Sequence, residues 1–136
     1  MQKAFIDTSI IIRLMVKDSE LKYKAVEKLL TEAKTQGVAL YLLPVAVLET
    51  VFVLEKVYKL DKNSIAERVS ALLNTPDITI ELQDVFIKAV KCYTEKNIKF
   101  ADAVMGHWGL EKNLNIVYTY DKIDFNRISC LEVRQH

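Results

Sequence analysis

The chain has 136 residues, of which 51% are hydrophobic and 27% are charged. A chain of this length is expected to form one domain with a core of its own, which excludes a multidomain assembly and a small scaffold that depends on disulfides. Nineteen basic and eighteen acidic residues leave a net charge of +1, so any binding of a polyanion must depend on a local patch.

Cysteine content and hydropathy favour a cytoplasmic protein. Cys92 and Cys130 lack the spacing of a metal motif and are too few for a disulfide framework, so we interpret them as structural thiols. Asp7 interrupts the only apolar stretch at the N-terminus, which excludes a visible secretion signal. The most apolar segment, 38–54, is divided by Pro44 and is shorter than the roughly 20 residues of a membrane-spanning helix.

The hydrophobic pattern predicts strands that alternate with helices along the whole chain. Short apolar runs indicate strands, and apolar residues at helical spacing between lysines and glutamates indicate helices. The strands are expected at residues 3–6, 38–43, 77–80, 115–121 and 130–134, and the helices at 8–17, from 20 to a stop at Gly37, 44–60, 64–73, 85–93 and 100–113.

Several residues at the starts of these helices have the properties of caps. Thr8 or Ser9 is expected to cap the first helix, Pro44 suits the first turn of the third, and Ser64 with Glu67 has capping-box spacing. Strands of nearly continuous apolar sequence separated by helices indicate an α/β layered domain on a parallel sheet. In such sheets, ligands gather outside the carboxyl ends of the strands.

Four acidic residues lie in apolar contexts, whereas the other fourteen lie on lysine-rich faces, in turns or near caps. A carboxylate in apolar surroundings is unfavourable unless it is paired, hydrogen-bonded or bound to a cation. One of them belongs to a helix that is apolar nearly all round and is therefore expected to be mostly buried. Each acid alone is explained by a salt bridge or a helix cap, but the predicted topology lets all four converge at one edge of the sheet. The four are Asp7, Glu49, Asp102 and Asp121.

Convergence of these acids predicts a divalent metal site. Two unit charges about 4 Å apart repel by about 4 kcal/mol at an effective dielectric of about 20, so either some carboxylates bind protons or divalent cations occupy the centre. Oxygen ligands without histidine or thiolate select Mg²⁺ or Mn²⁺. Such ions suit phosphodiester hydrolysis, and the only histidines, His107 and the terminal His136, offer little material for histidine-based catalysis.

Other folds that use acidic clusters fit the sequence less well. A phosphatase of the haloacid dehalogenase type needs a second aspartate two residues after Asp7, where this chain has Ser9. A phosphoacceptor receiver domain presents adjacent acids at the end of its first strand, but Asp7 stands alone. The chain also lacks a glycine-rich phosphate loop, so nothing supports hydrolysis of nucleoside triphosphates.

The segments "FIDTS", "LETVFVLEK", "FADAVMGHWGLEKN" and "VYTYDKIDF" together resemble the PIN-domain ribonucleases, particularly the VapC-type toxins of toxin–antitoxin systems. The resemblance covers the chain essentially from end to end, in the order and spacing of the family. It implies a single PIN domain over residues 1–136, with three α/β/α layers around a central parallel sheet of four to five strands. It also implies catalytic and metal-binding roles for Asp7, Glu49, Asp102 and Asp121.

The resemblance assigns supporting roles as well. Ser9 and Thr119 match small polar residues that support the family's metal site. Ile123 separates the last motif acid, Asp121, from the Asp-Phe pair that commonly follows it more closely. Asp124 can therefore share or replace the role of Asp121, and the alternative is that Asp124 is a solvated turn residue.

The function implied is that of a cytoplasmic, Mg²⁺- or Mn²⁺-dependent endoribonuclease that cuts RNA, forms a homodimer and is inhibited by a small antitoxin protein. A PIN nuclease for RNA maturation and a non-catalytic PIN scaffold that binds protein or RNA are the alternatives. Four basic residues near the N-terminus can contact RNA phosphates, and a solvated helix face also explains them. They are Arg13, Lys17, Lys22 and Lys24.

Overall fold

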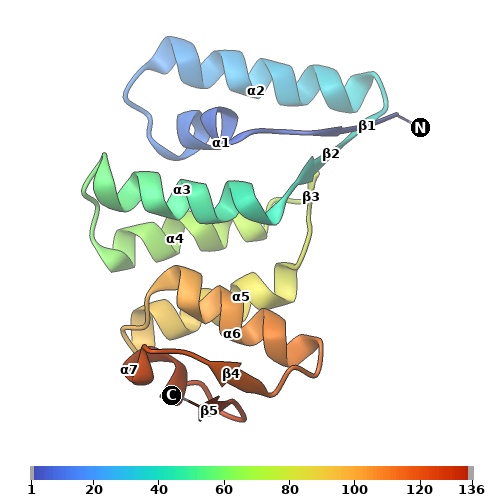
Figure 1. Ribbon diagram of the computed structural model, residues 1–136. Helices are drawn as coiled ribbons and strands as arrows, with labels where there is room; N and C mark the ends of the chain where they lie inside the picture. The colour runs from blue at the N-terminus through green and yellow to red at the C-terminus, as the bar shows by residue number, and fades with distance from the viewer. Residues whose placement is uncertain (1, 135–136) are drawn as a thin grey trace. The chain divides into compact units, whose positions relative to one another are not determined.

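The computed structural model describes residues 2–134. Its helices and strands alternate along the chain (Figure 1). The contacts divide the chain into two compact units. Unit 1 contains the described residues up to Lys59 together with residues 74–81, and unit 2 contains residues 60–73 together with the described residues from Leu82 onward.

Unit 1 is built on a parallel sheet in the order β1-β2-β3. Its strands are β1 (Gln2–Phe5), β2 (Val38–Leu42) and β3 (Ile78–Ile80), and its helices are α1 (Thr8–Met15), α2 (Glu20–Thr35) and α3 (Pro44–Lys56). Helix α2 packs against β2, and α1 contacts both α2 and α3. Buried side chains from all three helices and from β2 form the core, among them Ile11, Val26, Leu42, Val47 and Leu54.

Unit 2 is mainly helical. It contains α4 (Lys62–Leu73), α5 (Gln83–Glu95), α6 (Phe100–Glu111), β4 (Ile116–Tyr118), α7 (Lys122–Asn126) and β5 (Glu132–Arg134). Helix α5 contacts both α4 and α6, and β4 pairs with β5 in parallel. The Phe100 ring is stacked against Phe86 at a centroid distance of 6.2 Å and meets Tyr93 edge-on at 5.7 Å. These aromatic contacts join α5 to α6, the helix that carries Asp102.

The predicted α/β class with parallel strands is confirmed. Within residues 2–134 the strands are hydrogen-bonded as a sheet of three and a pair of two, whereas the sequence predicted one sheet of four to five strands. The difference arises because hydrophobic runs identify strands but carry little information on which strands pair. The short helix α7 was not predicted, because its five residues are too few to show a helical repeat.

Two predicted caps are wrong, and in both cases an aspartate does the capping. Asp7 caps α1, with its Oδ1 accepting a hydrogen bond from the Ser9 amide at 2.5 Å, so Thr8 and Ser9 already lie within the helix. Helix α4 begins before Ser64, whose amide donates to Asp61 Oδ1 at 2.7 Å. Aspartate caps a helix as well as serine or threonine does, so the choice among neighbouring candidates is not encoded in residue type.

The structure also bears on the predictions about the two cysteines and about membrane-spanning segments. Cys92 and Cys130 are both free cysteines, the first buried and the second exposed. Among the helices of residues 2–134, none combines the length and the apolar character that crossing a membrane would demand.

Candidate functional site

The predicted acids fall into two groups, one in each unit. Asp7 and Glu49 belong to unit 1, and Asp102, Asp121 and Asp124 belong to unit 2. Each group has surroundings of its own, and these determine its chemistry.

Asp7 and Glu49 line the same open groove in unit 1, which has a volume of about 400 Å³. Asp7 follows directly after β1 and its neighbour Ile6, and the extended backbone at Asp7 turns the chain into α1. The cap to the Ser9 amide occupies one oxygen of the Asp7 carboxylate. Arg13 and Lys22 line the same groove, so it carries both signs of charge.

Glu49 is exposed, although the helix that carries it was expected to be mostly buried. The buried residues of α3 lie on one side of the helix and include Val47, Val51 and Leu54. Glu49 lies outside that face, as does Phe52, whose exposed fraction is 58%. An apolar helix can therefore present a carboxylate to solvent, because apolar residues are common on protein surfaces.

Asp102, Asp121 and Asp124 form a carboxylate triple in unit 2. One carboxylate oxygen from each residue lies within 4.8 Å of the other two. Asp102 and Asp121 are half-buried, and Asp124 is buried, with an exposed fraction of 8%. The two earlier interpretations of Asp124 are thus separated: a solvated turn residue is wrong, and a position beside Asp121 is what the structure shows.

Backbone hydrogen bonds hold the carboxylate triple in place. Asp121 caps α7, with its Oδ1 accepting from the amides of Ile123 at 3.1 Å and Asp124 at 3.3 Å. Asp124 Oδ2 accepts from the amide of Lys99 at 3.2 Å, and Lys99 directly precedes α6. The first turn of α6, which carries Asp102, is thereby tied to the first turn of α7.

The crowding of negative charge perturbs Asp102. Partial burial raises the pKa of the Asp102 carboxyl above its ordinary value, and a hydrogen bond to Asp124 and the charges of Asp121 and Asp124 raise it further. Lys99 opposes this shift and lowers the pKa. The ionised triple is therefore unfavourable without a counter-charge. Three hard oxygen donors with no histidine or thiolate in the group fit Mg²⁺ or Mn²⁺ better than Zn²⁺ or Cu²⁺.

The two small polar residues predicted to support the site lie beside its acids. Thr119 Oγ1 accepts a hydrogen bond from the Asp121 amide at 2.8 Å, which fixes the turn between β4 and α7. Ser9 lines the groove of unit 1 and donates its amide to Asp7. Both residues act on the backbone or carboxylate of an acid two positions away.

Close packing also holds α6 against the segment that follows α7. A Cβ atom on Gly106 would lie 2.5 Å from Ile128 Cδ1, and Ile128 is buried. Phe125, one residue after Asp124, is buried as well. The absence of a side chain at Gly106 therefore permits the approach of the two segments that supply the carboxylate triple.

Sequence reasoning missed Asp18 and the amide of Lys99. Asp18 lines the groove of unit 1, but it lies in a polar connection between two helices, where an acid gives no unusual signal. The Lys99 amide acts through the backbone, so its residue type is uninformative.

His107 pairs with Cys92, whose Sγ lies 3.1 Å from His107 Nε2. Burial raises the pKa of the Cys92 thiol and lowers the pKa of His107, so both groups are held neutral. This pair supports the interpretation of both as structural residues. His136 lies outside the described residues.

Comparison with known proteins identifies a family for this geometry. Residues 4–129 match the PIN domain. The chain is also 23% identical over 131 residues to a VapC ribonuclease from Aquifex aeolicus, in an alignment that covers 93% of this chain and 96% of that relative. The match to the PIN domain includes every predicted site residue in both units and most of the chain. The chain therefore belongs to the PIN domain family.

Proposed function

We propose that this PIN-domain protein is a metal-dependent endoribonuclease that hydrolyses RNA phosphodiester bonds and serves as the toxin of a toxin–antitoxin pair. The observation that carries the proposal is the carboxylate triple of unit 2. Its three carboxylates lie so close together that their ionised form is unfavourable without a dication. Similarity to a VapC ribonuclease over nearly the full length of both chains supports the choice of RNA as substrate.

The proposed metal ligands are Asp7, Glu49, Asp102 and Asp121, and Asp124 joins them. A bound Mg²⁺ or Mn²⁺ ion would lower the pKa of water and offset charge on the phosphate oxygens. The protein's own contribution is to hold the carboxylates in position: helix capping orients Asp7 and Asp121, and Thr119 restrains the backbone at Asp121. Ser9 restrains the Asp7 carboxylate by donating its backbone amide to Oδ1.

The proposal also covers the extent of the domain, its partners and its role in the cell. The family match runs across both units, which supports treating residues 1–136 as one functional PIN domain. A VapC-type toxin would have a small antitoxin protein as its partner and would act as a homodimer on cytoplasmic RNA. Growth arrest on expression, relieved by the product of a neighbouring short reading frame, would distinguish a toxin from an enzyme of RNA maturation.

The central experiment measures cleavage of single-stranded RNA by the purified protein with Mn²⁺, with Mg²⁺ and with EDTA. Asp7→Asn and Asp102→Asn are each expected to lower the cleavage rate by about 10²–10³-fold, the range for removing one group that stabilises transition-state charge. Asparagine is the informative replacement at Asp7, because it removes the charge and still caps α1.

Matched controls replace acids outside both groups. Asp84→Asn changes an exposed acid in the first turn of α5, and Glu27→Gln changes an exposed acid of α2. Both are expected to leave cleavage unchanged. Full activity in EDTA, or in the Asp7→Asn/Asp102→Asn double variant, would reject the mechanism, and calorimetry without Mn²⁺ binding would identify a non-catalytic scaffold.

A further inference from the structure

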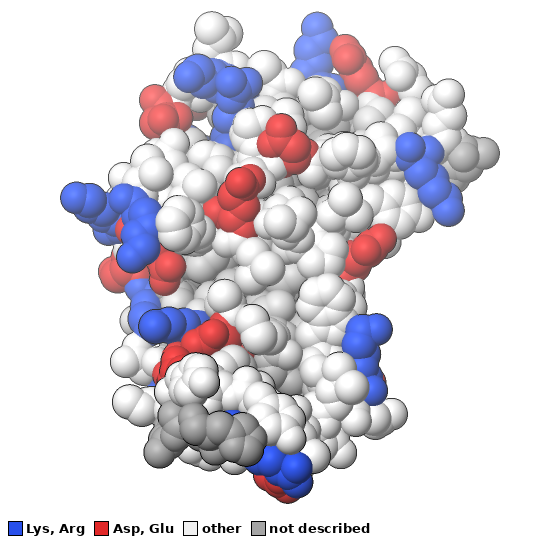
Figure 2. All heavy atoms as spheres, in the orientation of Figure 1, with Lys and Arg blue, Asp and Glu red and all other residues white. Residues whose placement is uncertain are grey.

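The groove of unit 1 contains more than its two predicted acids. Five charged residues line it: Asp7, Asp18 and Glu49 are negative, and Arg13 and Lys22 are positive. Both cations are exposed, so their charged ends are accessible to a ligand in solution. Figure 2 shows that acidic and basic side chains are interspersed over the face in view, so local arrangement decides where an anion binds.

The structure separates the four basic residues that the sequence treated alike. Lys17 lies over the Tyr23 ring, with Nζ 4.3 Å from the ring centroid, and Lys24 Nζ lies 3.9 Å from Glu20 Oε1. Neither of them lines the groove. None of the ion pairs found within residues 2–134 involves Arg13 or Lys22.

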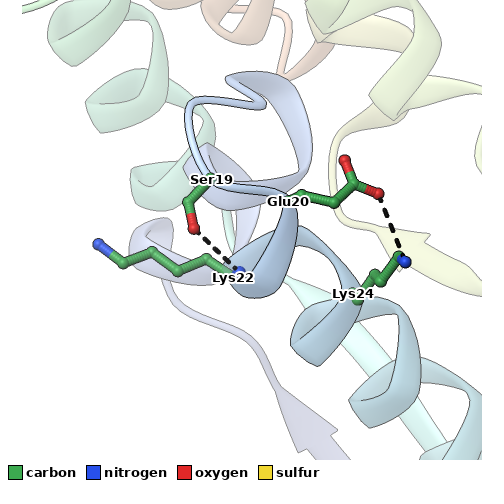
Figure 3. Close-up of polar contacts among 4 residues, drawn as sticks. All are labelled: Ser19, Glu20, Lys22 and Lys24. Atoms are coloured by element: carbon green, nitrogen blue, oxygen red, sulfur yellow. Dashed lines mark hydrogen bonds and ion pairs between the residues drawn. The ribbon is translucent and has the colours of Figure 1, made fainter.

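Figure 3 shows how α2 separates its first two lysines. The Lys22 side chain extends away from the Glu20–Lys24 pair, although the two lysines are only two positions apart. The Ser19 hydroxyl accepts a hydrogen bond from the Lys22 amide at 3.3 Å and caps the helix. The cap fixes where α2 starts, and Lys22 lines the groove whereas Lys24 does not.

The charges of the groove make anion binding depend on a bound metal ion. Three carboxylates and two cations leave the groove with a formal charge of −1, which repels a phosphate. A dication on Asp7 and Glu49 would reverse that charge to +1. Arg13 and Lys22 can then contact phosphate oxygens, because neither of them belongs to an ion pair found within residues 2–134.

We infer that Arg13 and Lys22 are RNA-binding residues, which hold backbone phosphates of single-stranded RNA in the groove beside Asp7 and Glu49. The inference rests on the proposed function and adds the residues that bind its substrate. Arg13 offers a planar fork to two phosphate oxygens, and Lys22 offers a point charge. Lys17 and Lys24 make no comparable contribution.

The test measures RNA binding separately from cleavage. All proteins carry Asp102→Asn, which suppresses cleavage and changes no residue that lines the groove of unit 1. They bind a labelled single-stranded RNA oligonucleotide at several salt concentrations, with Mn²⁺ at a concentration that saturates the Asp102→Asn protein in calorimetry. Adding Arg13→Gln and Lys22→Gln is expected to weaken binding by about 10-fold at ~0.1 M salt. The slope of log affinity against log salt should fall by about 1.4, or 0.7 for each lost phosphate contact.

The matched control adds Lys17→Gln and Lys24→Gln, which removes the same charge from the same part of the chain. Its affinity for RNA should stay within about twofold of that of the Asp102→Asn parent, and its salt slope within about 0.3. Equal effects of the two double variants would overturn the inference, because net charge alone would then explain them. An unchanged slope on loss of Arg13 and Lys22 would also overturn it, because neither residue would then contact a phosphate.

The outcomes for this inference and for the proposed function are distinguishable. If the otherwise wild-type chain does not cut RNA in Mn²⁺, the proposed function fails, whatever the binding data show. If it cuts RNA and the Arg13→Gln/Lys22→Gln variant binds RNA as the control does, only the inference fails. In the active protein, the inference further expects a KM that rises by about 10-fold, kcat within about threefold, and unchanged Mn²⁺ affinity by calorimetry.

Discussion

The two groups of acids differ in how much they need a cation. In unit 1, Asp7 and Glu49 are exposed and share an open groove with Arg13 and Lys22. In unit 2, the carboxylate triple is half-buried to buried, and burial with neighbouring charge raises the pKa of Asp102. One group is a solvated surface of mixed charge, and the other is a concentration of like charge.

This difference separates two tasks that a nuclease must perform. Crowded carboxylates favour binding of a dication, because the ion relieves their mutual repulsion. A groove of mixed charge can hold a substrate phosphate once a dication offsets its carboxylates, because Arg13 and Lys22 are then available as donors. We therefore expect the carboxylate triple to dominate metal affinity and the groove to contribute more to RNA binding.

The largest expected effect concerns the affinity for Mn²⁺ measured by calorimetry. Asp102→Asn is expected to weaken binding by more than about 100-fold, since loss of a ligand should exceed the 10–100-fold effect of losing a partner outside the coordination shell. Asp7→Asn is expected to weaken it by only about 10-fold. Equal losses in the two variants would show that both groups hold the ion alike and would remove the distinction drawn above.

Addition of metal should reverse the order of Tm between the wild-type protein and the Asp102→Asn variant. In EDTA, Asp102→Asn is expected to raise Tm by at most about 3–5 °C, because it removes a partly buried charge beside two others, whose cost after solvent screening is below about 1 kcal/mol. With Mn²⁺ at about 100 times its Kd, the wild-type protein gains about 2.7 kcal/mol and should become the more stable. Glu49→Gln serves as the comparison from unit 1, and an equal rise in its Tm in EDTA would contradict the assignment of repulsion to unit 2.

A smaller effect is expected from Thr119→Val. This change removes the oxygen that accepts from the Asp121 amide and should lower the free energy of unfolding by about 1 kcal/mol, with about a 10-fold loss of Mn²⁺ affinity. Thr94→Val is a matched control in the same unit, since the Thr94 hydroxyl bonds only to carbonyls of α5. The support role of Thr119 would be refuted if both variants had the same Mn²⁺ affinity as wild type.

The smallest expected effect is on the pH dependence of stability. The pKa of His107 is lowered from its ordinary value of 6.5, so below that pH the unfolded chain binds a proton first and the folded state loses stability. The loss should be less than about 1 kcal/mol after solvent screening. His107→Gln should flatten the fall in Tm between pH 7 and pH 5.5, and an unchanged slope would show that other groups cause it.

The pH dependence of stability above pH 9 offers a check on the same His107–Cys92 pair. The pKa of the Cys92 thiol is raised above its ordinary value of 9.0, so above pH 9 the unfolded chain releases its proton first and stability falls. Cys92→Ser should reduce that fall, and replacement of the exposed Cys130 by serine should not.

The elements of this fold were largely predictable because each has a local cause. Pro44 fixes the start of α3, and Gly37, with φ of +71°, follows the end of α2. Strand pairing was not predictable in the same way, because it depends on contacts between distant segments. Glu49 shows the same limit: the composition of α3 is local, but which face of the helix is buried depends on what packs against it.

The acids of the candidate site stand out in the sequence by their apolar context and their places beside strands. Their grouping was not predictable, because Asp124 resembled an ordinary turn residue until the fold buried it beside Asp102 and Asp121. The distinction between Lys22 and Lys24 was equally hidden, since both lie in a solvated helix and only the groove separates them.

Gly106 has a practical consequence for genetic study. Because a methyl group there would meet Ile128 Cδ1, Gly106→Ala requires that buried side chain to shift. The change should strain the contact between α6 and the segment after α7 by up to about 1–3 kcal/mol, without altering any acid. A penalty of that size is tolerable in the cold and damaging in the heat. The substitution is therefore a rational starting point for a temperature-sensitive allele, through which a harmful gene product could be propagated silently and switched on by cooling the culture.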